Sequence, residues 1–479
     1  MTDPRATDMQ HEAVVVGSGP NGLAAGISLA EAGHTVRIYE ANDTIGGGCR
    51  SLELTLPGFV HDLCSAIHPL AVASPFFRTI PMASYGLEWA NPPFAVAHPF
   101  DDGSAAVLSQ SLEETAASVG EDGQAWIDLF APLVEDFDIL IGPLLGPFQL
   151  PRHPIAMARF GLSGLQPAHR MMRSRFSGER ARALFAGLAG HSIIDLNKPA
   201  TAAFGLVLGL IGHVVGWPLP KGGSQQITNA LVEHFRALGG EIVTGTPVTS
   251  LDIADGADAV MFDVTPKQFL GIVGDAVPGR YRRQLEQYRY GGGVFKIDWA
   301  LDGPVPWTAE ECAQAGTVHL GATMEEIVTA EHEAAIGRHP ERPFVILAQQ
   351  SLFDETRAPD GKHTLWGYCH VPNGSIVDMT ERIEAQIERF APEFRECIIE
   401  RSVIPPAEME VHNANYIGGD INGGIQDIRQ LFTRPVPRLD PYSTPNPRLY
   451  FCSASTPPGG GVHGMGGYHG ARSALRRAW

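Results

Sequence analysis

The order of apolar and polar positions divides the first fifty residues into a strand, a helix and a second strand. Residues 13–16 (AVVV) form an unbroken apolar run that ends at a glycine, which predicts a buried strand. Leu23, Ile27 and Ala30 recur at helical spacing and predict a helix over residues 21–32. Residues 35–39 predict a second strand, which ends in Glu40. The pattern is typical of a β-α-β unit.

The turn between the first strand and the helix carries a glycine motif. Gly17, Gly19 and Gly22 follow the order G-x-G-x-x-G, in the strand and helix context that a dinucleotide-binding loop requires. The glycines permit a tight turn and a close approach of backbone N–H groups to a pyrophosphate. Glu40 is placed where a carboxylate binds ribose hydroxyls. The residues predicted to contact the dinucleotide here are Gly17, Ser18, Gly19, Pro20, Asn21, Gly22, Glu40 and Ala41.

A second glycine cluster follows the acidic strand at once. Gly46, Gly47 and Gly48 precede Cys49 and Arg50, where a plain NAD-binding fold would enter another helix. A second group of backbone donors suits a longer ligand that continues past the first helix. The sequence therefore predicts FAD, with Gly47, Gly48 and Arg50 among its contacts.

With these motifs the chain resembles the FAD-dependent phytoene desaturase and amine oxidase superfamily. It is most similar to the phytoene dehydrogenase-related branch, also called pyridine nucleotide-disulphide oxidoreductase domain 2-like. Residues 218–251 form a second block of resemblance, with a helix expected at 224–238 and a strand at 241–244. The resemblance implies that Val248 pairs with the adenine and that Thr265, after a strand at 259–262, lies against the cofactor.

The third block of resemblance covers residues 448–475. A strand at 449–452 leads through crowded glycines to a terminal helix around 470–477. The resemblance implies that this turn holds the pyrimidine edge of the flavin, with Gly464 and Met465 near N1 and O2. Ser453 and Gly461 are the other cofactor contacts expected in this block. Cys452 is out of place for flavin attachment, so the FAD is expected to be non-covalent.

The three blocks and the two insertions between them predict an α/β (α+β) protein of two domains. Residues 10–85, 216–290 and 441–479 are assigned to a Rossmann-like FAD-binding domain. Residues 86–215 and 291–440 are assigned to a discontinuous substrate domain, an antiparallel sheet roofed by helices. The active cleft is expected between the domains. The pattern indicates nothing about oligomeric state.

Composition excludes some classes of binding partner. The chain has 479 residues and a net charge of −18, which argues against nucleic acid and against electrostatic docking on anionic lipid. Its six cysteines show no metal-ligand spacing, which predicts no metal site and fits a reducing compartment. Residues 1–12 are polar and lack the apolar core of a secretory signal, so a cytoplasmic protein is expected.

Residues 202–217 (AAFGLVLGLIGHVVGW) are almost wholly apolar but shorter than the roughly twenty residues that span a bilayer. Two interpretations stay open. The segment is either a buried helix lining the substrate domain or a surface through which the protein touches a membrane peripherally and admits an apolar substrate.

Three side chains are candidates for proton handling. Lys296 lies on an expected strand that enters the cleft, and the resemblance to amine oxidases implies a lysine that holds a water at flavin N5. An ion pair with Asp298 is the alternative interpretation. His463, in the flavin-facing turn, and His68, after the second glycine cluster, are candidate acid–base groups. Aromatic and histidine residues that could line the pocket, but are more often structural, are His191, Tyr290, Trp366, Tyr368, His370 and Tyr416.

These expectations converge on an FAD-dependent oxidoreductase that desaturates an apolar substrate, such as a polyene, isoprenoid or acyl chain. Hydride would pass to flavin N5. Because no second dinucleotide motif is found, oxygen or a quinone is the expected acceptor. Three alternatives stay open: a flavin amine oxidase, a redox-neutral flavin isomerase, and a non-enzymatic lipid- or protein-binding protein similar to Rab GDP-dissociation inhibitors.

Overall fold

A five-stranded parallel sheet organises one half of the molecule. The computed structural model describes residues 11–479, so most of the polar N-terminal segment lies outside the described residues. The strands are β1 (Ala13–Val16), β2 (Val36–Tyr39), β9 (Glu241–Val243), β10 (Ala259–Phe262) and β16 (Leu449–Phe451). They lie in the order β16-β10-β1-β2-β9, so segments from both ends and the middle of the chain build one sheet.

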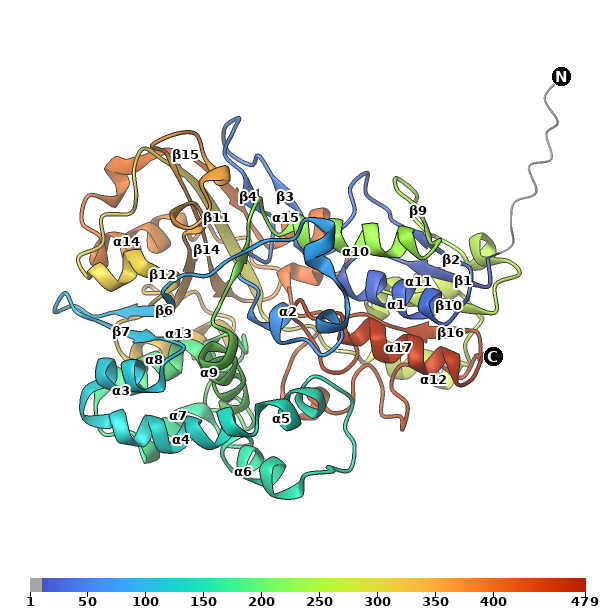
Figure 1. Ribbon diagram of the computed structural model, residues 1–479, viewed down its shortest axis with the longest axis horizontal. Coiled ribbons are helices and arrows are strands. Elements are labelled where there is room, and N and C mark those ends of the chain that lie inside the picture. The colour runs from blue at the N-terminus through green and yellow to red at the C-terminus, as the bar shows by residue number, and fades with distance from the viewer. Residues whose placement is uncertain (1–10) are drawn as a thin grey trace.

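Helices cover both faces of this sheet (Figure 1). Ala13 and Val15 of β1 pack into the core shared with α1 (Pro20–Glu31), α10 (Gln225–Ala237) and α17 (Met465–Leu475). Val14 and Val16 point the other way, into the core shared with α11 (Pro266–Val273) and α12 (Gly279–Glu286). Because successive residues of a strand face opposite sides, an unbroken apolar strand is what a doubly covered parallel sheet needs.

A seven-stranded sheet organises the other half. Its strands are β6 (Phe94–Pro99), β7 (Ala105–Leu108), β11 (Gly293–Leu301), β12 (Ala315–Leu320), β13 (Val345–Ala348), β14 (His363–Val371) and β15 (Ile398–Ile404). The order is β15-β11-β14-β13-β12-β6-β7. The expectation of a wholly antiparallel sheet is wrong at one place, since β12 and β6 pair in parallel. These two strands come from different insertions, and no hairpin constrains their direction.

Helices cover this sheet unequally. α14 (Thr380–Phe390) packs on one face through Ile383, Ile387 and Phe390. A helical layer from the first insertion packs below the sheet (Figure 1). Its helices are α3 (Leu112–Val119), α4 (Gly123–Glu135), α5 (Phe137–Leu144), α6 (Pro154–Gly164), α7 (Ala168–Arg175), α8 (Glu179–Gly190) and α9 (Ala202–Val215), joined by α13 (Met324–Ala335). The remaining short elements are α2 (Pro69–Ala73), α15 (Pro406–His412), α16 (Ile428–Leu431), β3 (Ser51–Leu52), β4 (His61–Asp62), β5 (Trp89–Ala90) and β8 (Leu219–Pro220).

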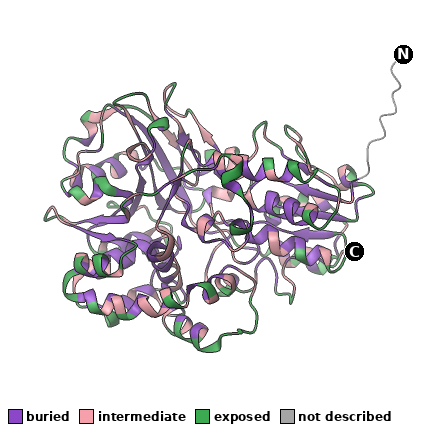
Figure 2. Cartoon of the chain, viewed as in Figure 1, coloured by how far each residue is buried: buried purple, intermediate pink, exposed green. Residues whose placement is uncertain are grey.

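A buried ion pair ties the two halves together. Asp62 of β4 pairs with Arg357, from the second insertion, and neither side chain is exposed. Asp62 also accepts hydrogen bonds from Ser51 Oγ (2.8 Å) and Ser224 N (2.8 Å). Figure 2 shows buried residues concentrated in the two sheets and the helices packed on them. The exact domain boundaries given above stay a prediction.

The apolar helix α9 packs inside the protein and is not an exposed surface helix. Leu206, Leu210 and Ile211 are fully buried, while Phe204 and Val207 line an internal cavity. This favours the interpretation as a helix lining the substrate domain. Within residues 11–479, no helix has the length and apolar character that crossing a bilayer requires.

Candidate functional site

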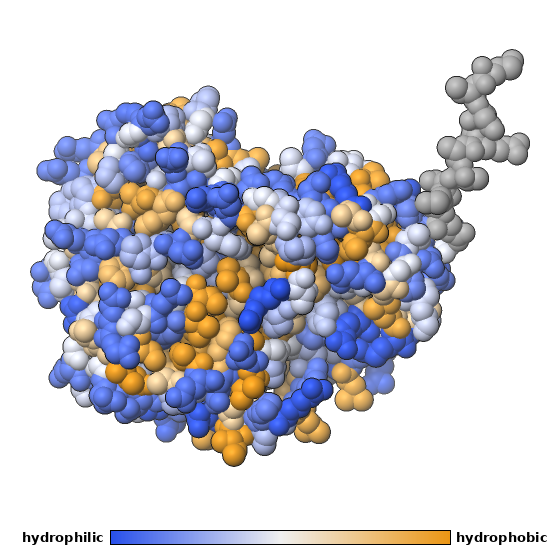
Figure 3. Space-filling model, viewed as in Figure 1, coloured by the Kyte–Doolittle hydropathy of each residue, from blue (hydrophilic) through white to orange (hydrophobic). Residues whose placement is uncertain are grey.

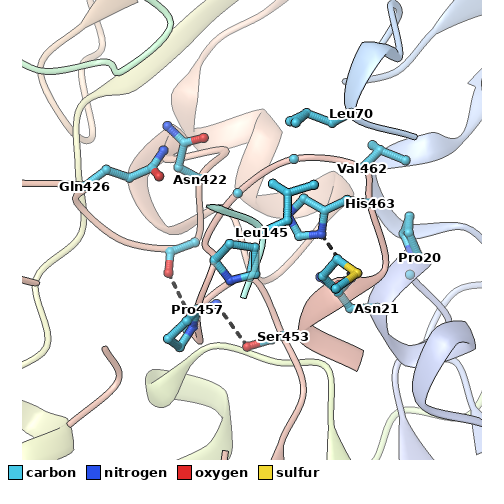
Figure 4. A pocket seen from close by; sticks show the side chains of 18 of the residues that line it. Pro20, Asn21, Leu70, Leu145, Asn422, Gln426, Ser453, Pro457, Val462 and His463 are labelled. Atoms are coloured by element: carbon cyan, nitrogen blue, oxygen red, sulfur yellow. Dashed lines mark hydrogen bonds between the residues drawn. The ribbon is translucent and has the colours of Figure 1, made fainter. Parts of the chain in front are cut away.

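One cavity of about 1910 Å³ runs from the dinucleotide loop into the second half of the molecule. Most of the predicted cofactor contacts lie in its wall: Gly17, Ser18, Gly19, Pro20, Asn21, Glu40, Ala41, Gly47, Gly48, Val248, Thr265, Ser453, Gly461 and Met465. In Figure 4, Pro20 and Asn21 lie on one side of it, and Asn422 and Gln426 on the other. The three blocks of the sequence therefore meet around one space.

The fingerprint loop is packed too closely for any side chain at its glycines. A Cβ on Gly22 would lie 2.0 Å from Gly17 O, and a Cβ on Gly19 would lie 2.7 Å from Asp263 Oδ2. Gly17 has φ +100°, a region that favours glycine. Gly22 is not in the cavity wall, so it supports the turn from behind. This is the packing role expected of the third glycine.

The second glycine cluster lies directly on the first. A Cβ on Gly47 would come within 3.0 Å of Gly19 Cα, and Gly46 N donates to Ser18 Oγ (3.3 Å). Arg50 is turned away from the cavity. Its guanidinium donates to Gly47 O (3.1 Å) and to the carbonyl of His412. Arg50 therefore braces the loop, and direct contact with a cofactor stays a prediction.

Glu40 is buried and fully engaged by protein donors. Its Oε2 accepts from Ser18 N (3.0 Å) and Ser18 Oγ (2.7 Å). Its Oε1 accepts from Asn42 N (2.9 Å) and Asn42 Nδ2 (2.9 Å). A carboxylate offers about four acceptor positions. A ribose bound here would share Glu40 with Ser18 or Asn42, so the carboxylate also fixes the two loops.

Asp263 is a site residue that the sequence reasoning missed. It follows β10, and its Oδ2 accepts from Gly22 N (2.9 Å) at the start of α1, the helix end expected to face a phosphate. Burial, and secondarily the charge of Glu40, raises the pKa of Asp263 well above its usual value. The signal available in the sequence was an acidic residue directly after the apolar run 259–262. The structure shows why it matters, since β10 pairs in register with β1 and places Asp263 beside Gly17.

The C-terminal turn lies partly in the cavity wall, through Gly461, His463 and Met465. Gly464 has φ +67° and is the N-cap residue of α17; it packs against Phe77 and does not line the cavity, so its contact with a flavin stays a prediction. His463 Nδ1 accepts from Met465 N (3.0 Å), which leaves the ring proton on Nε2. Burial lowers the pKa of His463 to about 4. His463 is therefore neutral at pH 7 and suits a hydrogen-bond donor better than a cationic acid.

His68 has a fixed tautomer. Ser224 Oγ donates to Ser65 O (2.6 Å) and so accepts from His68 Nε2 (2.8 Å). Nδ1 then carries the lone pair, and it is buried without a hydrogen-bond partner among the described residues. Burial lowers the pKa of His68 to about 4. His68 lines the cavity, where it can accept a hydrogen bond from a ligand.

Lys296 is buried, but it does not line the cavity. Its ammonium pairs with Asp298, and it lies 5.9 Å from the centre of the Trp366 ring, which is in the cavity wall. Burial raises the pKa of Asp298 to about 6. The ion-pair interpretation describes what is seen. A role for Lys296 beside the flavin stays a prediction.

The part of the cavity beyond the loops is an apolar chamber. Its wall is formed by α9, β12, β13 and β14, through Phe204, Val207, Thr317, Ile346, Trp366 and Tyr368. Tyr416 also lines the cavity, whereas Tyr290 instead donates to Thr265 Oγ1 (3.1 Å). His191 adds a polar group to the wall, since its Nε2 lies 3.0 Å from His319 Nε2. Burial lowers the pKa of His191 to about 3, so it too is neutral.

The residues present fit a dinucleotide. Asn21 Oδ1 and His68 Nδ1 are buried in the cavity wall without hydrogen-bond partners among residues 11–479. The glycines at 17, 19 and 47 allow the two loops to pack closely on each other and on Asp263, and all three line the cavity. Buried polar groups normally have partners, so the wall is arranged for a polar ligand.

Comparisons with known proteins agree with this geometry. Residues 15–79 match the family described as NAD(P)-binding Rossmann-like domain. The chain has a Rossmann dinucleotide fold. It is 24% identical to the mouse (Mus musculus) pyridine nucleotide-disulfide oxidoreductase domain-containing protein 2, over 98% of this chain and 94% of that protein. It is 25% identical to a phytoene dehydrogenase of Streptomyces griseus, over 76% and 73% of the two chains.

Two solved structures show the same fold along nearly the whole chain. An oxidoreductase from Methanosarcina mazei superposes with a TM-score of 0.66 at 16% identity, covering 97% of this chain and 99% of that one. A triple mutant of putrescine oxidase superposes with a TM-score of 0.62 at 19% identity, covering 98% of both chains. The predicted resemblance, the fold class and the oxidoreductase class are confirmed. The predicted FAD cofactor is confirmed as the type that this fold binds.

Proposed function

We propose that the protein binds FAD non-covalently and desaturates an apolar substrate, which loses hydride from one carbon and a proton from the adjacent carbon as the double bond forms. The continuity of the cavity carries this proposal, since one space joins the glycine loops to the chamber lined by α9 and the second sheet. When bound, FAD supplies the hydride-accepting chemistry. Oxygen or a quinone is proposed as the final acceptor.

The residues of the chain have separate tasks in this proposal. The loops around Gly19 and Gly47 hold the phosphates, and Glu40 orients the ribose through the contacts that it shares with Ser18. His68 and His463 are neutral, so each orients a ligand by one hydrogen bond and neither brings a charge into the chamber. The apolar wall excludes water from the reacting carbon.

The chamber favours a mainly hydrocarbon substrate. Phe204, Val207, Ile346 and Trp366 offer no charge with which to hold an ionic group. His191, Thr317 and Tyr368 are polar but uncharged, and they suit a hydroxyl, carbonyl or similar neutral group on the substrate. The class of substrate proposed is therefore a polyene, isoprenoid or acyl chain.

An amine oxidase is the second candidate. The Trp366 and Tyr368 rings lie 5.1 Å apart at 83°, and both face the cavity. Two aromatic rings could receive a neutral amine, and the putrescine oxidase likeness makes this candidate worth testing. A desaturase and an amine oxidase differ in which substrate reduces the flavin.

The deciding experiment is anaerobic flavin reduction. The purified chain, loaded with FAD, is mixed with polyenes, acyl chains and amines while the flavin absorbance at about 450 nm is followed. Bleaching by an apolar chain, and its reversal by oxygen or a quinone, supports the proposal. Bleaching by amines alone would replace it with the second candidate.

Two substitutions in the loop after β2 test FAD binding separately from turnover. Glu40→Ala should weaken FAD binding by about 1.5–3 kcal/mol, because the ribose loses a charged acceptor. Asp43→Ala removes an exposed acid from the same loop and should leave FAD affinity unchanged. A wild-type protein that cannot be reconstituted with FAD would favour the non-enzymatic binding protein instead.

A further inference from the structure

The segment between α5 and α7 displays apolar side chains to solvent. Phe148, Leu150, Ile155 and Leu162 are 80%, 90%, 78% and 76% exposed. Single exposed apolar residues are ordinary, but a cluster on one loop and one helix marks an interaction site. Figure 3 shows hydrophobic side chains protruding along the lower edge, where Figure 1 places α6. We call Phe148, Leu150, Ile155, Leu162, Leu165 and Phe432 the mouth patch.

The mouth patch is continuous with the proposed substrate path. Phe148, Leu150, Leu165 and Phe432 are exposed, and they also line the cavity. The rings of Phe148 and Phe432 lie 6.2 Å apart at 80°, which joins the loop before α6 to the region after α16. The mouth patch therefore borders the cavity directly, and an apolar molecule on it lies at the cavity entrance.

The charge around the patch differs from that of the whole chain. The net charge is −18, yet residues 139–178 contain no Asp or Glu and five Arg. Arg159 pairs with Asp136, and Arg173 pairs with Glu325. Arg152, two residues from Leu150, is exposed and has no ion pair among the described residues. Since salt screens charges beyond about 8 Å, the local charge decides what docks here.

We propose that the mouth patch docks on a membrane surface that carries anionic phospholipids, and that the substrate enters the cavity from the lipid. Apolar side chains beside arginines suit the boundary between headgroups and acyl chains. A second copy of this chain fits less well, because a two-fold contact would bring the same arginine-bearing faces together. The inference deepens the proposed function by naming where an apolar substrate is collected.

Vesicle sedimentation tests the inference without turnover. FAD-loaded protein is mixed with vesicles of phosphatidylcholine alone, or of phosphatidylcholine with phosphatidylserine, and its flavin absorbance is measured in pellet and supernatant. We expect binding to the mixed vesicles that weakens with salt. Leu150→Ser with Ile155→Ser should lower the partition at least about tenfold, and Arg152→Gln should lower it about fivefold.

The matched control is Ile336→Ser with Ile376→Ser, which removes exposed apolar side chains from outside the patch and should leave binding unchanged. Flavin absorbance confirms that each variant is folded and loaded. Equal binding by the mouth variant and the wild type, or no binding to either vesicle, would overturn the inference. So would a dimer in gel filtration that the mouth substitutions dissociate. Substrate-driven bleaching in free solution would leave the proposed function standing in each of these cases.

Discussion

Gly467→Ala tests whether the contact between α1 and α17 holds the cofactor site together. A Cβ at position 467 would lie 1.9 Å from Asn21 O and 2.8 Å from Ala25 N. Both atoms belong to the backbone of α1, so no side chain can move aside. Carbon–oxygen contacts in proteins are found at about 3.3 Å or more. The two helices would therefore have to separate by roughly 1.4 Å.

That separation affects stability and binding differently. Overpacking costs about 1–3 kcal/mol, while replacing glycine in a helix returns at most about 1 kcal/mol. A net loss of about 1–2 kcal/mol in the free energy of unfolding is expected. Asn21 and Met465 lie in the cavity wall on the two helices concerned. Moving them apart should weaken FAD binding at least tenfold, about 1.4 kcal/mol.

Gly279→Ala is the matched control. Gly279 is the exposed first residue of α12 and lies outside the cavity wall, and the nearest atom to a Cβ there is Arg283 Nη1 at 3.7 Å. It should raise stability by up to about 1 kcal/mol and leave FAD affinity unchanged. Urea unfolding and fluorescence titration with FAD measure the two quantities. If the alanine at 467 leaves both stability and FAD affinity at the wild-type level, the helix contact does not support the site.

Three further predictions concern buried charges. Asp263→Asn keeps an acceptor for the N–H of Gly22 in α1. Because the pKa of Asp263 is raised, the ionised aspartate destabilises the folded protein as the pH rises above about 3.8. The variant should therefore be more stable than the wild type at pH 7 in thermal melts, and it should bind FAD at least as tightly. Arg357→Met leaves Asp62 buried and unpaired, and should cost about 3–5 kcal/mol in urea unfolding at pH 7. Since Arg357 contributes to lowering the pKa of Asp62, that cost should shrink below about pH 4, and a cost independent of pH would contradict the pairing. Lys296→Met should leave FAD binding intact and slow turnover at least tenfold, about 1.4 kcal/mol in the barrier; unchanged turnover would assign Lys296 to the ion pair with Asp298 alone.

The elements of the dinucleotide domain could be predicted because their signals are local. The strands at 13–16 and 259–262 are found as predicted, since each is an apolar run that ends at a glycine or an aspartate. The helix expected at 224–238 is found at Gln225–Ala237. Here period, length and flanking residues all point to the same structure.

The parts that were missed depend on distant segments. α17 begins at Met465, five residues before the predicted start, because Gly466 and Gly467 pack on α1 and this packing outweighs their poor helix propensity. The parallel pairing of β12 with β6 joins two insertions and has no signature in either segment. The mouth patch was missed since exposure depends on which face of α6 the other helices leave free.

The sheet order has a consequence for how the protein is made. β1, α1 and β2 leave the ribosome before the other strands of their sheet, yet both edges of β1 in the finished sheet are covered only after residues 259–262 have been synthesised. Until then an apolar strand edge is open to pairing with other chains. The helix that packs on the glycine loop comes later still, at Met465–Leu475. The dinucleotide site is therefore incomplete until Met465–Leu475 has been made, so the nascent chain meets chaperones with this site unfinished.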